Sequence, residues 1–301
     1  MSFRKFMAVV AICLSSNALK AAEIYTTVFN VIESKKTESL LILSGSDGRI
    51  YKTARTPENK EYFNALIGQV VLLDFYKSGE ELIVNRAKVV SSNEADPEVY
   101  DLNRFKYNEL RKFAPTDLVS YENVSKIFSS MLNDGDKRQS QCFKRAHIWA
   151  YDMWSKSNVD SEKVFIFYTR RFIQIDEYGW WFHVAPMVTA GAEKFVLDPT
   201  FMDRPVTLEA WKTRFVKGSS KITCPVVKHY NDFYENQWKR LCYLIITPMY
   251  HFRPMDIKMR DLKNKQRNHW ELSELQDARR AFKDGEKTYE GLDTGKKTIT
   301  H

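Results

Sequence analysis

Short runs of alternating apolar and polar residues characterise the chain from residue 24 to residue 90. Turns that contain glycine, such as Gly45, Gly48 and Gly79, separate several of these runs. Runs typical of strands cover residues 24–32, 40–43, 49–53, 69–76 and 81–90, with a helical patch over 59–67. Short strands joined by such turns are typical of a small barrel or sandwich. We therefore predict a β-rich N-terminal domain over residues 22–95.

The apolar spacing changes after a polar joint at residues 91–97. Residues 96–118 carry mixed charge and are expected to form a linker or helical joint. Beyond them Ser120 can cap a helix, because apolar residues follow it at intervals of three and four. A second helical stripe begins at Cys142. Its apolar members are Phe143, Ala146, Trp149, Ala150, Met153 and Trp154.

Three strand-like runs follow the second helix, at residues 163–169, 180–189 and 193–197, and Thr207 opens a short helix. A helix followed by antiparallel strands, without repeated strand-helix alternation, indicates an α+β fold. We place this second domain at residues 119–252. Residues 253–301 are highly charged and are predicted to be a partly helical C-terminal tail.

The N-terminus has the features of a secretory signal. Arg4 and Lys5 precede an apolar run at residues 6–14, and Ala21 and Ala22 are small residues suited to a cleavage site. We expect residues 1–21 to be removed near Ala21, which gives a secreted or periplasmic protein; a retained anchor is the alternative. No later stretch is long and apolar enough to predict stable membrane insertion.

The charge of the chain is only mildly basic. The formal net charge is +8, and removal of residues 1–21 lowers it further because they contain Arg4, Lys5 and Lys20 and no acidic residue. No stripe of Lys and Arg interleaved with aromatic residues is present, so we expect no nucleic-acid partner.

The number and positions of the cysteines indicate the first candidate for a reactive residue. Cys142, Cys224 and Cys242 remain beyond the predicted signal. An odd number in an oxidising compartment indicates one disulfide and one thiol that stays free. Cys224 and Cys242 are the natural pair and close a short loop, worth about 3 kcal/mol on the chain-entropy model. Cys142 is then the free thiol.

Three residues in sequence order can form a thiol-imidazole-carboxylate set. Cys142 lies at a helix start, where free N–H groups and the helix dipole favour a thiolate; a small buried apolar residue is the alternative. His183 lies in an apolar strand and needs partners for its nitrogens, in catalysis or as an ordinary core histidine. Asp198 can orient the imidazole, or simply begin a turn before Pro199.

The sequence argues against His147 as the catalytic base and against a zinc site. His147 lies five residues after Cys142 in the same predicted helix, so it points away from the thiol and is a poorer base than His183. Cys142, His147 and His183 lack the spacing of zinc ligands. We therefore expect neither a metal nor a cofactor.

The candidate set lies within blocks of sequence that resemble bacterial protein glutaminase, the secreted protein-glutamine deamidase. The blocks are residues 142–147, 181–185, 197–200 and 204–207, followed by Ala210 and Trp211. The resemblance spans roughly residues 141–244. It implies a papain- or transglutaminase-like core with Cys142 as nucleophile, His183 as base and Asp198 as orienter. It also implies an inhibitory pro-segment, and residues 22–95 occupy the position expected for one.

The predicted reaction is the deamidation of protein-bound glutamine to glutamate through a Cys142 thioester, with ammonia as the other product. The backbone N–H of Cys142 and the side chain of Gln141 are candidate oxyanion donors. Trp180 and Trp181 line the substrate channel in this prediction, with a plain core role as the alternative. We expect a monomer that acts on glutamine-bearing proteins or peptides.

Two further classes of function stay open at this point. One is a related thiol acyl-transfer enzyme, a transglutaminase or a cysteine protease. The other is a non-enzymatic envelope or binding protein built on a degenerate version of the fold.

Overall fold

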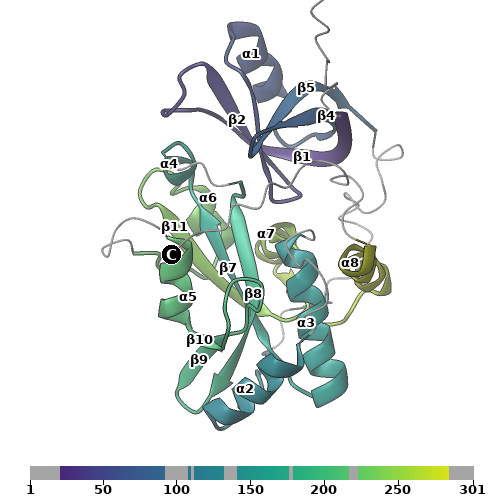
Figure 1. Ribbon diagram of the computed structural model, residues 1–301, viewed down its shortest axis with the longest axis vertical. Coiled ribbons are helices and arrows are strands. Elements are labelled where there is room, and N and C mark those ends of the chain that lie inside the picture. Colours follow the sequence, from purple (N-terminus) through teal and green to yellow (C-terminus); the bar gives the residue numbers. More distant parts are fainter. Residues whose placement is uncertain are drawn as a thin grey trace, which may run out of the picture.

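The first part of the chain folds as a closed barrel. The computed structural model describes residues 21–91, 108–109, 112–131, 141–175, 179–216 and 223–284. The barrel strands follow the order β1-β2-β3-β5-β4, and Figure 1 shows the barrel above the rest of the molecule. Its elements are β1 (Ala21–Glu33), β2 (Leu40–Gly45), β3 (Ile50–Ala54), α1 (Pro57–Ala65), β4 (Val70–Ser78) and β5 (Glu81–Val89).

The sequence pattern explains how the barrel closes. Alternate residues of β4, among them Val71, Leu73 and Phe75, are buried inside it, as expected for a strand with one face in a core. Helix α1 begins with Thr56, whose hydroxyl accepts the Asn59 N–H, and Phe63 adds an aromatic side chain to the barrel core. The predicted small β-rich unit is thus a barrel rather than a sandwich.

The second part of the chain is built around an antiparallel sheet in the order β10-β9-β8-β7-β11. Its strands are β7 (Glu162–Tyr168), β8 (Phe182–Ala190), β9 (Glu193–Val196), β10 (Val206–Thr207) and β11 (Cys242–Pro248). Strands β7 and β8 are buried almost throughout, because helices and the barrel cover this sheet. The α+β class predicted from the sequence is confirmed.

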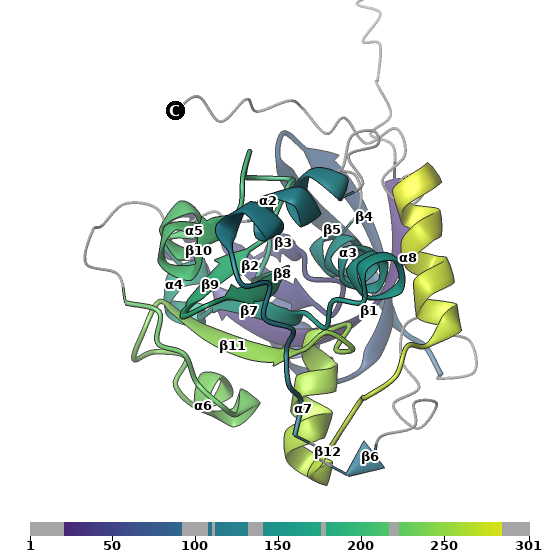
Figure 2. The same ribbon diagram turned by 90° about the horizontal axis from the view of Figure 1, so that it is seen from below.

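Helices surround the sheet (Figure 2). They are α2 (Tyr121–Ser130), α3 (Cys142–Ser157), α4 (Arg170–Ile173), α5 (Leu208–Phe215), α6 (Tyr230–Tyr234), α7 (Pro254–Lys263) and α8 (Leu272–Asp284). Ser120 and Thr207 cap α2 and α5 through their hydroxyls, as the sequence predicted. A small pairing of β6 (Asn108–Glu109) with β12 (Lys265–Gln266) completes the described elements. Within these residues no helix has the length and apolar character needed to cross a membrane.

The described part of the predicted charged tail, residues 253–284, contributes side chains to the main core, and residues 285–301 lie outside the described part of the chain. Ile257 of α7 and both Leu275 and Ala278 of α8 are buried in the same cluster as Phe143 of α3. Helix α8 lies alongside α3 in both ribbon views (Figures 1 and 2). Two acidic side chains of α8, Glu274 and Asp277, are buried, and the fully buried guanidinium of Arg267, which precedes the helix, donates to Glu274. Part of the high charge of residues 253–284 therefore belongs to buried ion pairs.

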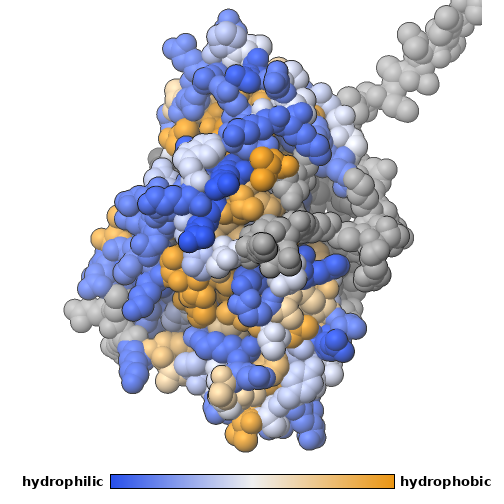
Figure 3. Space-filling model, turned by 90° about the vertical axis from the view of Figure 1, so that its left-hand side faces the viewer, coloured by the Kyte–Doolittle hydropathy of each residue, from blue (hydrophilic) through white to orange (hydrophobic). Residues whose placement is uncertain are grey.

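The barrel packs on the second part of the chain through the outer side of β1, β2 and β3. Ile32, Ile42 and Ile50 are buried in the core cluster of the α+β unit. On the face shown in Figure 3, hydrophilic residues cover much of the barrel, and apolar residues gather below it. The two units therefore share an apolar contact.

Candidate active site

A buried imidazole-carboxylate pair lies at the centre of the sheet. His183 is on β8, and Asp198 follows β9, which runs antiparallel to β8. The Leu197 N–H donates to the Pro186 carbonyl, so the pairing continues past the end of β9. As a result His183 Nε2 and Asp198 Oδ2 lie 2.7 Å apart, with both side chains almost fully buried. Neighbouring strands thus bring the predicted base and orienter into direct contact.

Trp211 on α5 contacts both residues of this pair. Its Nε1 donates to the same Oδ2 of Asp198 at 3.0 Å, and its ring is stacked on that of His183 with centroids 5.7 Å apart. The Asp198 backbone carbonyl accepts from the N–H groups of Phe201 and Met202. Side chain and backbone of Asp198 are thus both fixed.

The role of Trp211 was missed by reasoning from the sequence. Its apolar spacing indicated only that it belonged to the buried face of a short helix. The one available signal was its place in the sequence block 210–211 that resembles protein glutaminase. A fully buried tryptophan needs an acceptor for its indole N–H, and Asp198 is that acceptor.

Aromatic rings surround the imidazole of His183. The ring centroids of Phe215, Phe201 and Trp180 lie 4.5, 5.2 and 5.6 Å from that of His183. These rings limit access of water to the imidazole and leave its polar contacts to a few defined groups. An ionic contact is stronger in such an environment than in water.

Cys142 is the free thiol of the described chain and begins helix α3. Helix α3 packs against β8, the strand that carries His183. Cys142 is half-buried and lies near enough to His183 to contribute to the rise in its pKa, while Nδ1 of His183 makes no hydrogen bond to the described residues. Because Asp198 occupies Nε2 of His183, Nδ1 is the nitrogen available to the sulfur.

The surroundings of His183 favour its protonated form. Burial acts to lower the pKa of the imidazole, but the charge and hydrogen bond of Asp198 raise it, and Cys142 adds a smaller rise. The pKa of His183 is raised to about 9 by this balance. An opposite charge in contact with a buried base commonly outweighs desolvation in this way.

The first turn of α3 presents backbone donors near the thiol. Gln141 has extended backbone geometry, and within the described residues its side chain makes no capping hydrogen bond. Its carbonyl accepts from the N–H groups of Lys144 and Arg145. The N–H of the first residue of a helix has no acceptor within its own helix, so that of Cys142 can donate to a substrate oxygen.

The two candidate channel tryptophans have different surroundings. Trp180 is half-buried and lies beside the His183 ring. Trp181 is 1 % exposed; its ring lies against Phe29 of the barrel, and its Nε1 donates to the Gly45 carbonyl at 2.6 Å. Only Trp180 thus borders the imidazole, and Trp181 joins the core to the barrel.

The turn between β2 and β3 contacts the chain immediately before β8. The Ile50 N–H donates to the Gly179 carbonyl at 2.9 Å, and the Trp181 N–H donates to the Gly48 carbonyl at 3.1 Å. Gly48 has φ +89°, and a Cβ there would come within 2.9 Å of the Phe182 ring. The barrel thus holds the segment that leads to His183 by backbone pairing and close approach.

His147 lies in a separate buried cluster. Its Nδ1 is 2.8 Å from the Nζ of Lys163, and its Nε2 is 3.7 Å from Glu274 on α8. Burial and the nearby positive charges of Lys163, Arg267 and Arg253 hold the pKa of His147 well below its usual range. Among the described residues, no three His, Cys, Asp or Glu side chains form a group suited to a metal ion.

The predicted disulfide is confirmed. Cys224 and Cys242 are bonded, with Cα atoms 4.9 Å apart, and both are buried. The bond attaches the chain before α6 to strand β11, which is also paired through a bridge between Val226 and Leu244.

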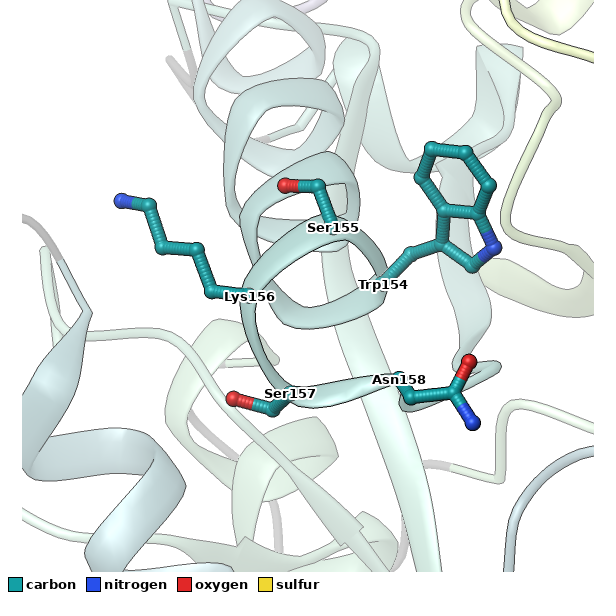
Figure 4. Close-up of a pocket in the computed structure, with 5 residues that line it drawn as sticks. All are labelled: Trp154, Ser155, Lys156, Ser157 and Asn158. Atoms are coloured by element: carbon teal, nitrogen blue, oxygen red, sulfur yellow. The ribbon is translucent and has the colours of Figure 1, made fainter.

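A shallow pocket lies at the opposite end of α3 from Cys142. Figure 4 shows its lining side chains, which come from one stretch of chain: Trp154, Ser155, Lys156, Ser157 and Asn158. None of the candidate catalytic residues lines it, so the His183 region is the better candidate site.

Comparisons with known proteins match the segment that holds the candidate residues. Residues 120–215 match the family model described as glutaminase; Cys142, His183, Asp198 and Trp211 all lie within them. No curated protein matches the sequence. A crystal structure of pro-protein-glutaminase matches with 14% identity and a TM-score of 0.52, over 90% of this chain and 98% of that chain.

A second solved structure, the A47Q2 mutant of pro-protein-glutaminase, matches with 15% identity and a TM-score of 0.50. It covers 78% of this chain and 85% of that chain. At these identities the likeness shows a shared fold. The chain therefore resembles protein glutaminase, as its sequence blocks indicated, in a matched segment that holds the candidate site and in a fold shared with the pro-form structures.

Proposed function

We propose that the chain is a protein-glutamine glutaminase that converts glutamine side chains of proteins to glutamate. The observation that carries the proposal is the buried His183, whose Nε2 is hydrogen-bonded to Asp198 and whose pKa is raised in part by the neighbouring, half-buried Cys142. The family match over residues 120–215 and the fold shared with pro-protein-glutaminase support it.

In this proposal Cys142 and His183 act as an ion pair. With a pKa of about 9, His183 is protonated at neutral pH and is a suitable partner for a thiolate at Cys142. The thiolate attacks the carboxamide carbon, and the backbone N–H of Cys142 stabilises the oxyanion, with the Gln141 side chain as a further candidate donor. His183 gives its proton to the leaving nitrogen, and ammonia departs from the thioester.

Water completes the reaction. His183, now neutral, takes a proton from water as the water oxygen attacks the thioester carbon. The thiolate leaves, the imidazole is again protonated, and the carboxylic acid product loses its proton to the released ammonia. Asp198 holds Nε2 throughout, so Nδ1 faces the reacting atoms; Trp211 keeps the carboxylate in place. The sum is one carboxamide and one water converted to one carboxylate and one ammonium ion.

The barrel is proposed to keep the enzyme inactive until it is removed. Its turn at residues 45–50 pairs with residues 179–181, next to the strand that carries His183. Arg170 of α4 adds a fork of two hydrogen bonds to Asn30 of β1, at 3.0 and 2.6 Å. The pro-form structures share this overall fold, which supports a pro-segment in residues 22–95 and a catalytic domain from residue 119.

Several related expectations belong to the same proposal. Residues 1–21 lie outside the described part of the chain except for Ala21, and they act as the cleaved secretory signal. The mature protein is secreted or periplasmic, acts as a monomer and needs no cofactor. Trp180 lines the substrate channel, and Trp181 lines it only after the barrel leaves.

Ammonia release tests the proposal. The full chain is incubated with a casein-like protein before and after limited proteolysis between residues 91 and 118, with Cys142→Ala as the matched control. We expect ammonia after cleavage, none from the variant, and no change in substrate chain length. New cross-linked bands would indicate a transglutaminase, shortened chains a protease, and equal effects of both proteins a binding role.

A further inference from the structure

Helix α3 carries Cys142 but starts without a side-chain cap. Helices α1, α2, α4 and α5 each begin at a Ser or Thr whose hydroxyl accepts a first-turn N–H: Thr56, Ser120, Thr169 and Thr207. At α3 the Gln141 side chain makes no such bond within the described residues. A helix end without a cap frays more readily, so other contacts must hold this first turn.

Those contacts come from the C-terminal helices. Lys144, in the first turn of α3, pairs with Asp277 of α8 at 3.1 Å, and both side chains are largely buried. Arg253, at the start of α7, lies 3.9 Å from the other oxygen of Asp277 and 5.0 Å from the ring of Phe143. The two residues that follow Cys142 are therefore both held from outside the helix.

The part of α8 that carries Asp277 is itself joined to α7 by buried ion pairs. Arg267 is fully buried and joins Glu274 of α8 to Asp256 of α7. One turn further along α8, Ala278 is fully buried, and small residues such as this allow close packing of neighbouring helices. A positive side chain in a helix first turn is unfavourable toward the dipole, so Lys144 is explained by its partner on α8.

We propose that Asp277 is a positioning residue, which holds the first turn of α3 through Lys144 and so places the Cys142 sulfur and N–H for reaction. The inference deepens the proposed glutaminase function and assigns a role to the C-terminal helix. Asp277 touches no reacting atom. Its effect passes through the orientation of the helix start.

The test compares Asp277→Asn with Arg279→Gln. The control also removes an ion pair between α8 and α3, that of Arg279 with Asp152 at 3.3 Å, but ten residues along α3 from the thiol. Two rates are measured on the full chain after limited proteolysis between residues 91 and 118: ammonia release, and alkylation of Cys142 by iodoacetamide at neutral pH, read by mass on the peptide that contains it.

For Asp277→Asn we expect kcat to fall about tenfold with KM within about twofold, because only the reacting groups are displaced. Alkylation should slow by a similar factor. Arg279→Gln should keep all three values within about twofold of wild type. Equal effects of the two variants on kcat and alkylation would overturn the proposal.

A change in the charge around Cys142 and a change in its position would alter the rate of alkylation in opposite directions. In Asp277→Asn the Lys144 ammonium loses a carboxylate partner, and by charge alone it would favour the thiolate and speed alkylation. Slower alkylation thus supports loss of position, and faster alkylation contradicts it. If Asp277→Asn does not fold, Lys144→Gln takes its place with the same kcat loss expected, and Lys144→Arg should restore activity.

The alkylation rate also separates this inference from the function on which it rests. If the cleaved wild-type chain releases no ammonia, the glutaminase proposal fails. The effect of Asp277→Asn on alkylation still decides whether α8 positions the thiol.

Discussion

Two histidines of this chain are equally buried but have opposite charge preferences. His147 on α3 and His183 on β8 both have 0% exposed surface. Lys163 lies beside His147, and burial with the nearby positive charges holds the pKa of His147 well below its usual range. Asp198 lies beside His183, and the pKa of His183 is raised to about 9. The charged partner, and not the depth of burial, decides which imidazole can donate a proton at neutral pH.

The largest difference in kcat is expected between variants that replace one histidine or the other. His183→Ala should lower kcat at least about 10³-fold, because it removes the proposed proton donor and base. His147→Gln should leave kcat within about threefold and lower the free energy of unfolding by about 1–3 kcal/mol, because its role is a buried contact. Ammonia release and urea unfolding measure the two effects. A His147→Gln variant that folds normally but is inactive would reverse the assignment.

Asp198→Asn tests whether the carboxylate makes the difference between the histidines. It removes the charge that raises the pKa of His183 and allows an amide NH₂ to face Nε2, which favours the wrong tautomer. We expect kcat to fall about 10³-fold, with the disulfide intact and little change in the far-ultraviolet circular dichroism. Activity within tenfold of wild type would show that the orienting carboxylate lies elsewhere.

The free energy of unfolding should change with pH, and each buried titratable group determines whether its contribution rises or falls. The folded-state pKa of His183, about 9, exceeds the usual value of 6.5, so its stabilisation is complete below pH 6.5 and is lost as pH rises through 9. The loss amounts to about 3 kcal/mol. The pKa of Glu274 is raised to about 7 mainly by burial, so it too favours the folded state less as pH rises from 4.5 to 7.

His251 changes stability in the opposite direction. Burial lowers its pKa to about 3, so the folded state loses stability as pH falls from 6.5 through 3. Urea unfolding across pH, for wild type and Asp198→Asn, separates these contributions. The decrease between pH 6.5 and 9 should largely vanish in the variant. An unchanged decrease would show that the His183–Asp198 pair does not cause it.

Trp211→Phe is the mildest change in the set. It keeps an aromatic ring against His183 but removes the donor to Asp198 Oδ2. We expect about a tenfold lower kcat, equal to ~1.4 kcal/mol, with KM little changed. Steady-state kinetics of ammonia release check this. An equal loss for Trp149→Phe, which changes a buried tryptophan in a separate core cluster with Val124 and Met153, would indicate a general packing effect.

The sequence predicted much of the framework because local signals there agree with the final fold. The barrel strands follow the predicted runs within a few residues, and Ser120 and Thr207 cap the helices expected of them. The order Cys142, His183, Asp198 also placed the candidate site on a helix start and two neighbouring strands. In each case the deciding signal lies within a few residues of the element.

The features that were not predicted depend on contacts between residues far apart in the sequence. Strand β11 and helix α7 were not predicted, and residues 254–284 were expected in a charged tail. In the structure Arg267 pairs with both Asp256 and Glu274 inside the core. A charged residue in a sequence does not reveal whether it has a partner in the core. Residues of buried ion pairs therefore look the same in the sequence as charged residues on a solvated surface. The contact of Trp211 with Asp198 was missed for the same reason.

Trapping of the covalent intermediate tests the central claim most directly. The cleaved chain is mixed with a glutamine-containing peptide, quenched rapidly in acid and digested, and the Cys142 peptide is weighed by mass spectrometry. The account predicts a thioester adduct on Cys142, equal to the substrate mass minus ammonia, and no adduct in Cys142→Ala. Ammonia release that continues in Cys142→Ala, or an adduct on another residue, would contradict it.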